Sequence, residues 1–383
     1  MTVLCGDDGM EYKRLGDIAT YINGYPFKPE DRGSEGLPII RIQDLTGNSY
    51  DLGFYSGEYP ARIEVNDGDV LISWSASLGV YVWDQGKALL NQHIFKVVFD
   101  KEEVNKDFFV FAVRHKLKEM ESKTHGATMK HIVKKDFDNT TIPFPSLEKQ
   151  AEIADVLSKV ENVIASRQQE LSALDDLIKA RFVEILQAVK SNAKVKLKEV
   201  VESERIITYG MVKPGPNVPD GVIIIKVKDF PNGVIETNDF LRADRELESR
   251  YARSRVKEGD LLFSIRGTVG RTAFVPIELV NANITQDTAR LSVDRSRFDA
   301  NFVRYALEYD DVQREIEAHI KGVAMRGISL AELREIHIPN IPLDIQKTFG
   351  AFVAQVDKSK YAVQKALDDT ETLFDCLMQK YFG

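Results

Sequence analysis

Residues 68–79 read GDVLISWSASLG and residues 259–270 read GDLLFSIRGTVG, so the same stretch occurs twice, 191 positions apart. Two further segments recur in the same order, each 196 positions apart: GATMKHI at 126–132 with GVAMRGI at 322–328, and IPFPSLEKQ at 142–150 with IPNIPLDIQ at 338–346. Solenoid repeats have periods of about 20–50 residues, so this much longer period is that of a duplicated domain. The sequence therefore predicts two similar but non-identical halves with approximate two-fold character, suited to a target that also has two parts.

The composition is that of a globular, core-forming chain. With 383 residues, 43% of them apolar, it is long enough for two or three domains. Cys5 and Cys376 fit no metal-binding or redox spacing, so we expect free thiols in a reducing compartment. The acidic N-terminal residues lack the apolar region of a signal peptide, and the apolar runs are too short to cross a bilayer. We therefore expect a soluble, cytoplasmic protein.

The charge of the chain is negative overall but unevenly spread. A net charge of −8 argues against a protein held on DNA by bulk electrostatics, because neutralising phosphates takes Lys and Arg. Residues 114–135 nevertheless hold seven Lys or Arg against two acidic residues, and residues 250–271 hold six against two. Each cluster fits either a nucleic-acid contact or an ordinary solvated face.

The two halves have the same order of predicted elements, which defines an α+β fold class. Each begins with short β-branched or aromatic runs bounded by Gly, Asp, Asn or Pro. These predicted strands are 37–42, 70–74, 79–83 and 95–99 in the first half, and 222–227, 261–265, 271–275 and 289–293 in the second. A predicted helix and a short strand ending in Ile-Pro follow, at 106–121 and 142–143 in the first half and at 301–320 and 338–339 in the second.

Each half closes with a long predicted helix, at residues 151–190 and 347–383. The apolar positions of both helices are spaced mostly by three or four residues, the pattern of a coiled-coil seam. Arg167 interrupts the first seam, whose positions together with those of the second are Ile153, Val156, Val160, Val163, Leu171, Leu174, Ile178, Phe349, Phe352, Val356, Val363, Leu367 and Leu373. Burying the two stripes against each other predicts an antiparallel coiled coil that joins two β-rich globular domains. The alternative is that each helix packs onto its own domain.

The sequence shows no motif of a self-sufficient enzyme. A GxxxxGK[ST] loop, a GxGxxG after a strand, HExxH, CxxC and a GxSxG elbow are all absent, as is the Asn/Asp-Pro-Pro-aromatic tetrapeptide of base methylation. His115, His125 and His131 fit no common metal-ligand spacing. We therefore expect a non-catalytic protein with no metal and no cofactor of its own.

The repeated Gly-Asp pairs, Gly68-Asp69 and Gly259-Asp260, each precede an apolar strand, and we interpret them as turns that fix strand register. The residues that follow the strand differ between the halves: WSAS at 74–77 and IRGT at 265–268. A kept scaffold with varied exposed residues is expected if the two halves read different sequences.

These segments resemble the specificity subunit of Type I restriction–modification systems, over essentially the whole chain. The resemblance rests on GDVLISWSASLG and GDLLFSIRGTVG, on Met129-Lys130 and Met325-Arg326 in Gly-containing loops, and on IPFPSLEKQAEIADVL and IPNIPLDIQKTF, which lead into the long helices. IPNIPLDIQ departs from the pattern, because it lacks the Glu-Gln ending of many relatives.

The resemblance implies a DNA-reading subunit without a catalytic centre. Residues 1–150 and 191–346 would be target recognition domains, each reading one half of a bipartite double-stranded DNA site, with the helices at 151–190 and 347–383 as the spacer. The implied partners are two methyltransferase subunits that methylate adenine N6 and, in the full complex, restriction subunits that cleave and translocate DNA. S-adenosylmethionine, ATP and Mg would bind to these partners, and the methyltransferase would flip the target adenine out of the duplex.

Base-edge contacts in the major groove would then carry the specificity, with Arg and Lys suited to guanine and Asn and Gln suited to adenine. The candidate DNA-binding residues are Lys28, Arg41, Gln43, Ser73, Ser75, Lys123, Lys130 and His131 in the first half, and Lys226, Lys228, Arg266, Thr268, Arg271, Lys321 and Arg326 in the second. For each of them an ordinary surface or salt-bridged position is the alternative.

Two other functions stay open from the residues alone. One is a protein–protein adaptor in which two β-rich modules on a coiled-coil rod hold partners without nucleic acid, and the negative net charge favours it. The other is a cryptic nuclease or methyltransferase, which the missing motifs disfavour. Sequence-selective DNA binding that requires a partner would separate the DNA-reading function from the adaptor.

Overall fold

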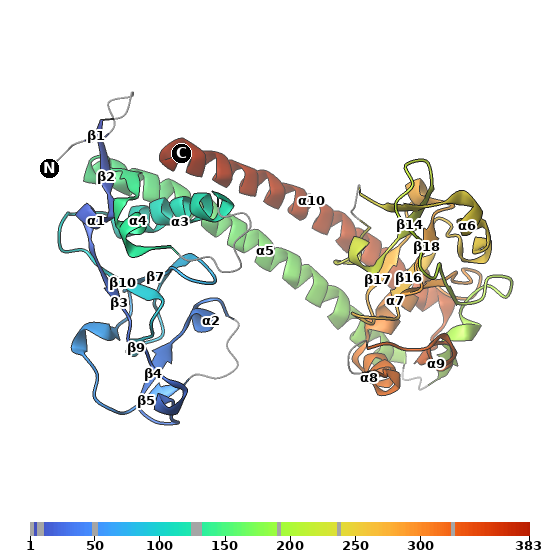
Figure 1. Cartoon of the computed structure of the whole chain (residues 1–383). Helices are drawn as coiled ribbons and strands as arrows, with labels where there is room; N and C mark the ends of the chain where they lie inside the picture. Colours follow the sequence, from blue (N-terminus) through green and yellow to red (C-terminus); the bar gives the residue numbers. More distant parts are fainter. Residues whose placement is uncertain are drawn as a thin grey trace. The chain divides into compact units, whose positions relative to one another are not determined.

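The computed structural model of the chain describes residues 4–5, 11–47, 53–123, 132–189, 193–235, 239–322 and 326–383. The chain divides into two compact units: unit 1 comprises Met1–Gln168 and Lys365–Gly383, and unit 2 comprises Gln169–Gln364. The two long helices, α5 (Leu147–Val189) and α10 (Leu343–Phe382), therefore contribute one end to each unit (Figure 1).

Unit 1 is built on an antiparallel sheet of four strands in the order β3-β10-β7-β8. These strands are β3 (Thr20–Asn23), β7 (Val70–Ser73), β8 (Gly79–Val82) and β10 (Ile94–Val98). Two further sheets have the orders β5-β4-β9-β6 and β1-β2-β11, with β1 (Leu4–Cys5), β2 (Glu11–Arg14), β4 (Leu37–Ile40), β5 (Phe54–Tyr55), β6 (Glu64–Val65), β9 (Ala88–Leu90) and β11 (Thr141–Pro143). The helices are α1 (Leu15–Ile18), α2 (Ile42–Leu45), α3 (Lys106–Lys123) and α4 (Lys134–Asn139).

Unit 2 repeats this plan. Its main sheet has the order β13-β19-β16-β17, with β13 (Thr208–Tyr209), β16 (Leu261–Ser264), β17 (Thr272–Phe274) and β19 (Thr288–Leu291). The other sheets are β15-β14-β18 and β12-β20, with β12 (Lys194–Lys196), β14 (Val222–Ile225), β15 (Leu241–Ala243), β18 (Asn283–Ile284) and β20 (His337–Pro339). The helices are α6 (Arg245–Ser249), α7 (Ala300–Glu308), α8 (Asp310–His319) and α9 (Leu330–Glu335).

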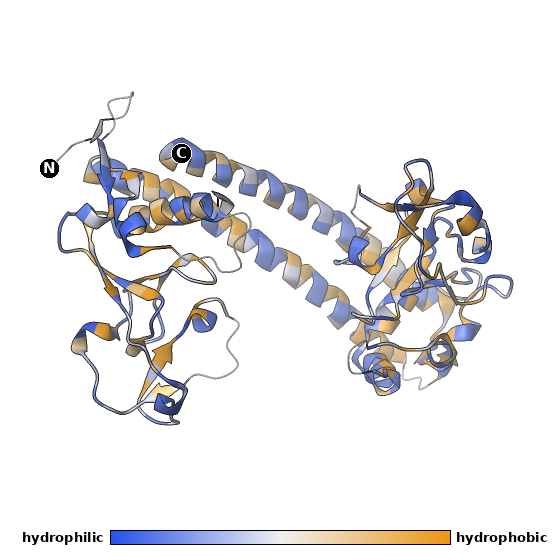
Figure 2. Ribbon diagram, viewed as in Figure 1, coloured by the Kyte–Doolittle hydropathy of each residue, from blue (hydrophilic) through white to orange (hydrophobic). Residues whose placement is uncertain are grey.

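Strand pairing confirms the duplication that the sequence predicts. β4 pairs parallel with β9 and antiparallel with β5, and β14 pairs parallel with β18 and antiparallel with β15. The central strands β7 and β16 are buried along their whole length because each lies between two cores. Val70 and Ile72 face the core that contains α3, whereas Leu71 faces the core of the second sheet. The unbroken apolar runs of the repeat are therefore strands covered on both faces, and Figure 2 shows apolar residues concentrated in the strands of both units.

The predicted single helix at 301–320 is wrong in one respect. It is two helices, α7 and α8, because Tyr309 between them has an extended backbone with φ −69° and ψ 137°. The break reorients the chain so that Val312 and Ile316 of α8 enter the same core as Phe302 of α7. Tyr309 itself packs against Phe182 of α5, with ring centroids 5.6 Å apart.

The repeated Gly-Asp pairs are turns, as interpreted from the sequence. Gly68 and Gly259 have positive φ angles of 85° and 74°, which favour glycine. The carboxylate of Asp69 accepts a hydrogen bond from the backbone N–H of Asn66 (2.8 Å), and that of Asp260 accepts one from Lys257 (2.7 Å). These residues therefore shape the scaffold.

The last residue of each Ile-Pro segment, Gln150 or Gln346, is buried and joins a long helix to its domain. Gln150 Oε1 accepts from the backbone N–H of Asn105 (2.9 Å) and its Nε2 donates to the carbonyl of Pro145 (2.9 Å). Gln346 makes the same two bonds, with Asp299 (3.0 Å) and Ile341 (2.8 Å). Asn105 and Asp299 directly precede the first turns of α3 and α7, so one amide fixes three segments at once.

The long helices pack against each other inside each unit. In unit 1, Ile153 and Leu157 of α5 share a core with Met378 and Phe382 of α10. In unit 2, the rings of Phe182 and Phe349 lie 5.3 Å apart. A continuous antiparallel coiled coil, which these contacts favour, stays a prediction. Each long helix also packs on its own domain, as Phe349 of α10 does on Phe302 of α7. The far end of α10 packs on the first half instead, where Phe382 contacts Phe108 of α3.

The predicted seam positions differ in burial, and three of them are exposed. Ile153, Ile178, Phe349, Val356 and Leu367 are buried, whereas Val160, Leu171, Leu174, Phe352 and Val363 are half-buried. Val156, Val163 and Leu373 are exposed. Each has an apolar neighbour, Leu157, Ile164 or Phe374, that faces inward instead. Where two adjacent residues are apolar, spacing alone does not decide which one faces in, and packing on α3, such as that of Phe374 on Phe111, decides it here.

Replacing Gln346 by Ala should lower the free energy of unfolding by about 1–3 kcal/mol, because the backbone N–H of Asp299 and the carbonyl of Ile341 lose their buried partner. Urea denaturation followed by circular dichroism measures this change. Gln355→Ala, at an exposed position of the same helix, is the matched control. Equal midpoints for the two variants would contradict the anchoring role.

Candidate nucleic-acid interface

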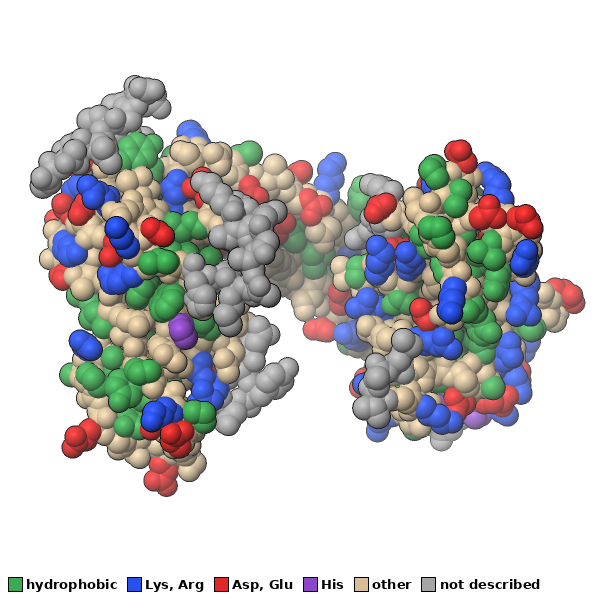
Figure 3. Space-filling view, in the orientation of Figure 1, with side chains coloured by type: hydrophobic (Ala, Val, Ile, Leu, Met, Phe, Trp, Pro, Cys, Tyr) green, Lys and Arg blue, Asp and Glu red, His purple; other side chains and the backbone are tan. Residues whose placement is uncertain are grey.

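A hollow of about 600 Å³ in unit 2 gathers most of the polar candidates of the second half. It is lined by Met211, Lys213, Pro214, Gly215, Lys226, Val227, Lys228, Leu241, Arg266, Gly267, Thr268, Thr285, Gln286 and Asp287. Four of these side chains are cationic and one is a carboxylate. On the face of unit 2 seen in Figure 3, Lys and Arg side chains are interspersed with apolar ones. Such a surface combines charge for phosphates with groups that can reach base edges.

The loop after β16 presents Arg266 and Thr268, both exposed. Ser264 at the end of the strand holds this loop, because its Oγ donates to the carbonyl of Thr268 (2.5 Å) and accepts from the backbone N–H of Arg271 (2.8 Å). The loop turns at Gly267, where φ is +72°. In unit 1, Ser73 Oγ donates to the carbonyl of Ser77 (2.5 Å), so the same device shapes the loop there.

The turn after β14 presents Lys228 in the short 3-10 helix η4 (Val227–Asp229). The buried carboxylate of Asp229 accepts from the backbone N–H of Lys226 (2.8 Å) and so fixes the turn. In unit 1, Asp44 accepts from the N–H of Arg41 (2.7 Å) in the same way. Gln43 and Lys228 are therefore exposed residues at equivalent positions, RIQD at 41–44 and KVKD at 226–229.

The connection from β18 to β19 presents Gln286 and Asp287. The backbone N–H of Met211 donates to the carbonyl of Ile284 (2.7 Å), and that of Gln286 donates to the carbonyl of Met211 (2.9 Å). Gly210 allows this contact, since a Cβ there would lie 1.8 Å from the carbonyl oxygen of Ile284. Main-chain hydrogen bonds thus hold the connection that presents Gln286 and Asp287.

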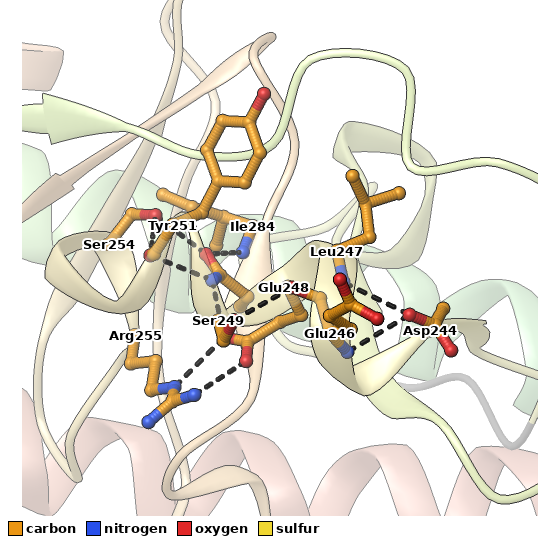
Figure 4. Close-up of polar contacts among 10 residues, drawn as sticks. Asp244, Glu246, Leu247, Glu248, Ser249, Tyr251, Ser254, Arg255 and Ile284 are labelled. Carbon is orange, nitrogen blue, oxygen red and sulfur yellow. Dashed lines mark hydrogen bonds and ion pairs between the residues drawn. The ribbon is translucent and has the colours of Figure 1, made fainter.

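Buried polar contacts anchor the strand that leads into this connection. Arg255 points toward the carboxylate of Glu248, and Ser254 points toward β18 (Figure 4). Arg255 binds both carboxylate oxygens (2.9 and 2.6 Å), and Asn283 Nδ2 donates to the same carboxylate (2.8 Å). Asn283 Oδ1 accepts from Ser254 Oγ (2.8 Å). The hydrogen bonds from Arg255 lower the pKa of Glu248 below its usual range, against the opposing effect of burial.

The charges of the hollow are largely available to a ligand. Nη1 of Arg266 lies 3.8 Å from Oδ1 of Asp287, and both side chains remain partly exposed. Within the described ranges, no carboxylate lies within ion-pair distance of the ammonium groups of Lys213, Lys226 or Lys228. These cations can therefore meet phosphates or base acceptors without first breaking an ion pair.

Four of the seven candidates in the second half line the hollow: Lys226, Lys228, Arg266 and Thr268. The other three do not line it. Lys321 pairs with Glu332 (2.5 Å), Arg326 pairs with Glu317, and Arg271 is half-buried. Among the polar lining residues, sequence reasoning missed Lys213, Thr285, Gln286 and Asp287. Aligning NQH at 91–93 with TQD at 285–287 would have drawn attention to the glutamine.

The candidates of the first half fare less well. Arg41 is buried and its Nε pairs with Asp44 (3.2 Å), so it is not open to a ligand here and its role in DNA binding stays a prediction. Ser73 and Ser75 are also buried, and Ser73 shapes the loop instead. Lys28 and Gln43 are exposed, with Lys28 3.8 Å from Glu30. The side chain of Lys123, at the end of α3, and residues Lys130 and His131 lie outside the described part of the chain.

Two searches bear on other functions. In the described ranges, no group of three His, Cys, Asp or Glu side chains could hold a metal ion, and His125 and His131 fall outside these ranges. Among the helices that the structure describes, none combines the length and apolar character needed to cross a membrane.

Comparison with known proteins identifies the family of this chain. The family model described as "Type I restriction modification DNA specificity domain" matches residues 7–175 and again residues 190–370. The chain belongs to this family. The specificity subunits of the family recognise the DNA target and are non-catalytic, while partner subunits methylate and cleave. The two matched ranges correspond to the two copies in the sequence.

Individual relatives resemble the chain over nearly its whole length. The Type I restriction enzyme EcoBI specificity subunit of Escherichia coli is 26% identical, covering 96% of this chain and 84% of the relative. The MjaVIII specificity subunit of Methanocaldococcus jannaschii is 25% identical, covering 93% and 89%. The crystal structure of an S subunit from M. genitalium has a similar fold, with a TM-score of 0.56 at 16% identity over 100% of this chain and 99% of that one. A chain from a study of complex assembly of the type I R-M system has a TM-score of 0.57 at 18% identity, covering 100% and 98%.

Replacing Glu248 by Gln should lower the free energy of unfolding by about 1–3 kcal/mol at neutral pH, because Arg255 loses a charged, buried partner. The pKa of this carboxyl is lowered in the folded protein, so its contribution is fully present above the usual glutamate pKa of 4.5 and is lost as the pH falls through the lowered value. Urea midpoints of both proteins between pH 7 and pH 3 should therefore converge at the acidic end. A gap that stays constant with pH would contradict the ion pair.

Replacing Arg266 by Ala should weaken binding of the assembled complex by about 1–3 kcal/mol, and only on DNA with the correct second half-site. Titrating duplexes in which either half is altered measures this. Arg314→Ala, on an exposed residue of α8, is the control. An equal loss on every sequence would make Arg266 a phosphate contact instead.

Proposed function

We propose that this chain reads a two-part double-stranded DNA site, with one half-site for each target recognition domain, residues 1–150 and 191–346. The observation that carries the proposal is the hollow of unit 2, where cationic side chains and a glutamine amide project from turns that main-chain hydrogen bonds hold in place. Unit 1 has the same scaffold with different exposed side chains, such as Gln43 in place of Lys228. Two scaffolds of one shape with two sets of side chains fit two different half-sites.

The electrostatics favour DNA reading in an assembly over DNA reading by the chain alone. The net charge of −8 limits how many phosphates the chain can neutralise, while the hollow concentrates cations locally. We infer that partner subunits share the phosphate contacts and that this chain supplies the base-edge contacts. The isolated chain should then bind DNA weakly.

The partners we propose are two methyltransferase subunits that methylate adenine N6 and, in the full complex, restriction subunits. The assembly described for the similar solved chain supports such a complex. S-adenosylmethionine, ATP and Mg would bind to those subunits. The complex would work in the cytoplasm. The helices α5 and α10 would form the coiled coil that spaces the two domains.

The experiment is a methylation map. The chain is co-expressed with the methyltransferase subunit encoded beside it, and N6-methyladenine is mapped across the host DNA by long-read sequencing. We expect a split motif, two short defined blocks around a gap of fixed length, that appears only when this chain is present.

A matched strain with the methyltransferase alone is the control. Stable association of the two proteins without any methylated motif would overturn the proposal, and would favour an adaptor that binds partners and no DNA.

A further inference from the structure

Several glutamines recur at equivalent places in the two halves, and two of these pairs differ in how the fold uses them. Gln150 and Gln346 are buried, and both ends of each amide are hydrogen-bonded within the fold. Gln92 and Gln286 are half-buried. Across the described part of the chain, neither of these two side-chain amides has a hydrogen-bond partner. Side-chain hydrogen bonds within the described fold therefore do not explain their repetition.

Strand register shows that Gln92 and Gln286 occupy the same position. Leu90 ends β9 and Ile94 starts β10, so Gln92 is the middle of three connecting residues. Gln286 is the middle of the three residues that connect β18 to β19. The backbone N–H of each glutamine donates at 2.9 Å to the residue after a close-packed glycine, Tyr25 or Met211. Both side chains therefore leave the same rigid piece of main chain.

The surroundings of the two glutamines differ. Gln286 lines the basic hollow with Lys228 and Arg266. By the same register, the matching positions of unit 1 hold Gln43 and Ser75. An amide that is kept while its neighbours change fits a contact that the two half-sites have in common. The neighbours would supply the contacts in which the half-sites differ.

We propose that Gln92 and Gln286 are specificity-determining residues that each read an adenine, at equivalent places in the two half-sites. The side-chain amide of glutamine matches the major-groove edge of adenine, because its oxygen accepts from N6 and its nitrogen donates to N7. The proposal rests on the proposed function, since it requires that these domains meet DNA bases.

The test repeats the methylation map with Gln286→Leu and Gln92→Leu, which keep the side-chain size and remove the amide. Gln286→Leu should relax one A·T position in the second half-site, with discrimination falling roughly 5- to 150-fold. Gln92→Leu should do the same at the matching place in the first half-site. Gln85→Leu, at an exposed turn of unit 1, should leave the motif unchanged.

Binding of the purified complex to synthetic duplexes then tests the contact itself. Replacing the identified adenine by 7-deazaadenine removes the N7 acceptor, so it should weaken binding by the wild-type complex and have no effect on the Gln286→Leu complex. If both variants methylate the same split motif as the wild type, or if the motif relaxes at a G·C pair, only this proposal is overturned. A wild-type complex without any split motif overturns the proposed function first.

Discussion

The buried amide at the start of each long helix is the contact on which the rest of this molecule depends. Gln150 and Gln346 each bind the segment that opens a domain helix and the Ile-Pro strand end that precedes the long helix. A burial of this kind is tolerated only because both ends of the amide are satisfied. The domain and the long helix therefore behave as one piece, and a reading surface on the domain can be held at a defined place relative to the helix that carries it.

The reading surface follows a related rule. Main-chain bonds and buried carboxylates fix its turns, so its exposed side chains are free to vary. Asp229 and Asp44 hold equivalent turns, while the exposed residues next to them are Lys228 and Gln43. Where unit 2 uses the buried polar pair Ser254 and Asn283, the aligned residues of unit 1 are the apolar Ile63 and Leu89. Specificity can thus change without disturbing the fold.

The duplication, the α+β class and most strands follow from the sequence because repeated apolar runs and turn residues are local signals. Side-chain direction is not local. Arg41 was a reasonable base reader by residue type, yet Asp44 binds it within a buried turn. Val156 and Leu157 are equally apolar, and only packing on the domain decides between them. Gln286 was missed because its importance lies in strand register, which unites residues that are far apart in the chain.

The central claim is that the hollow of unit 2 meets the bases of one half-site. Replacing Thr268, which is exposed in that hollow, by the photo-crosslinking residue p-benzoylphenylalanine tests this directly in the assembled complex. Sequencing the crosslinked DNA should place the adduct in the second half-site and nowhere else. Crosslinks confined to a partner protein, or spread equally over both half-sites, would contradict the account.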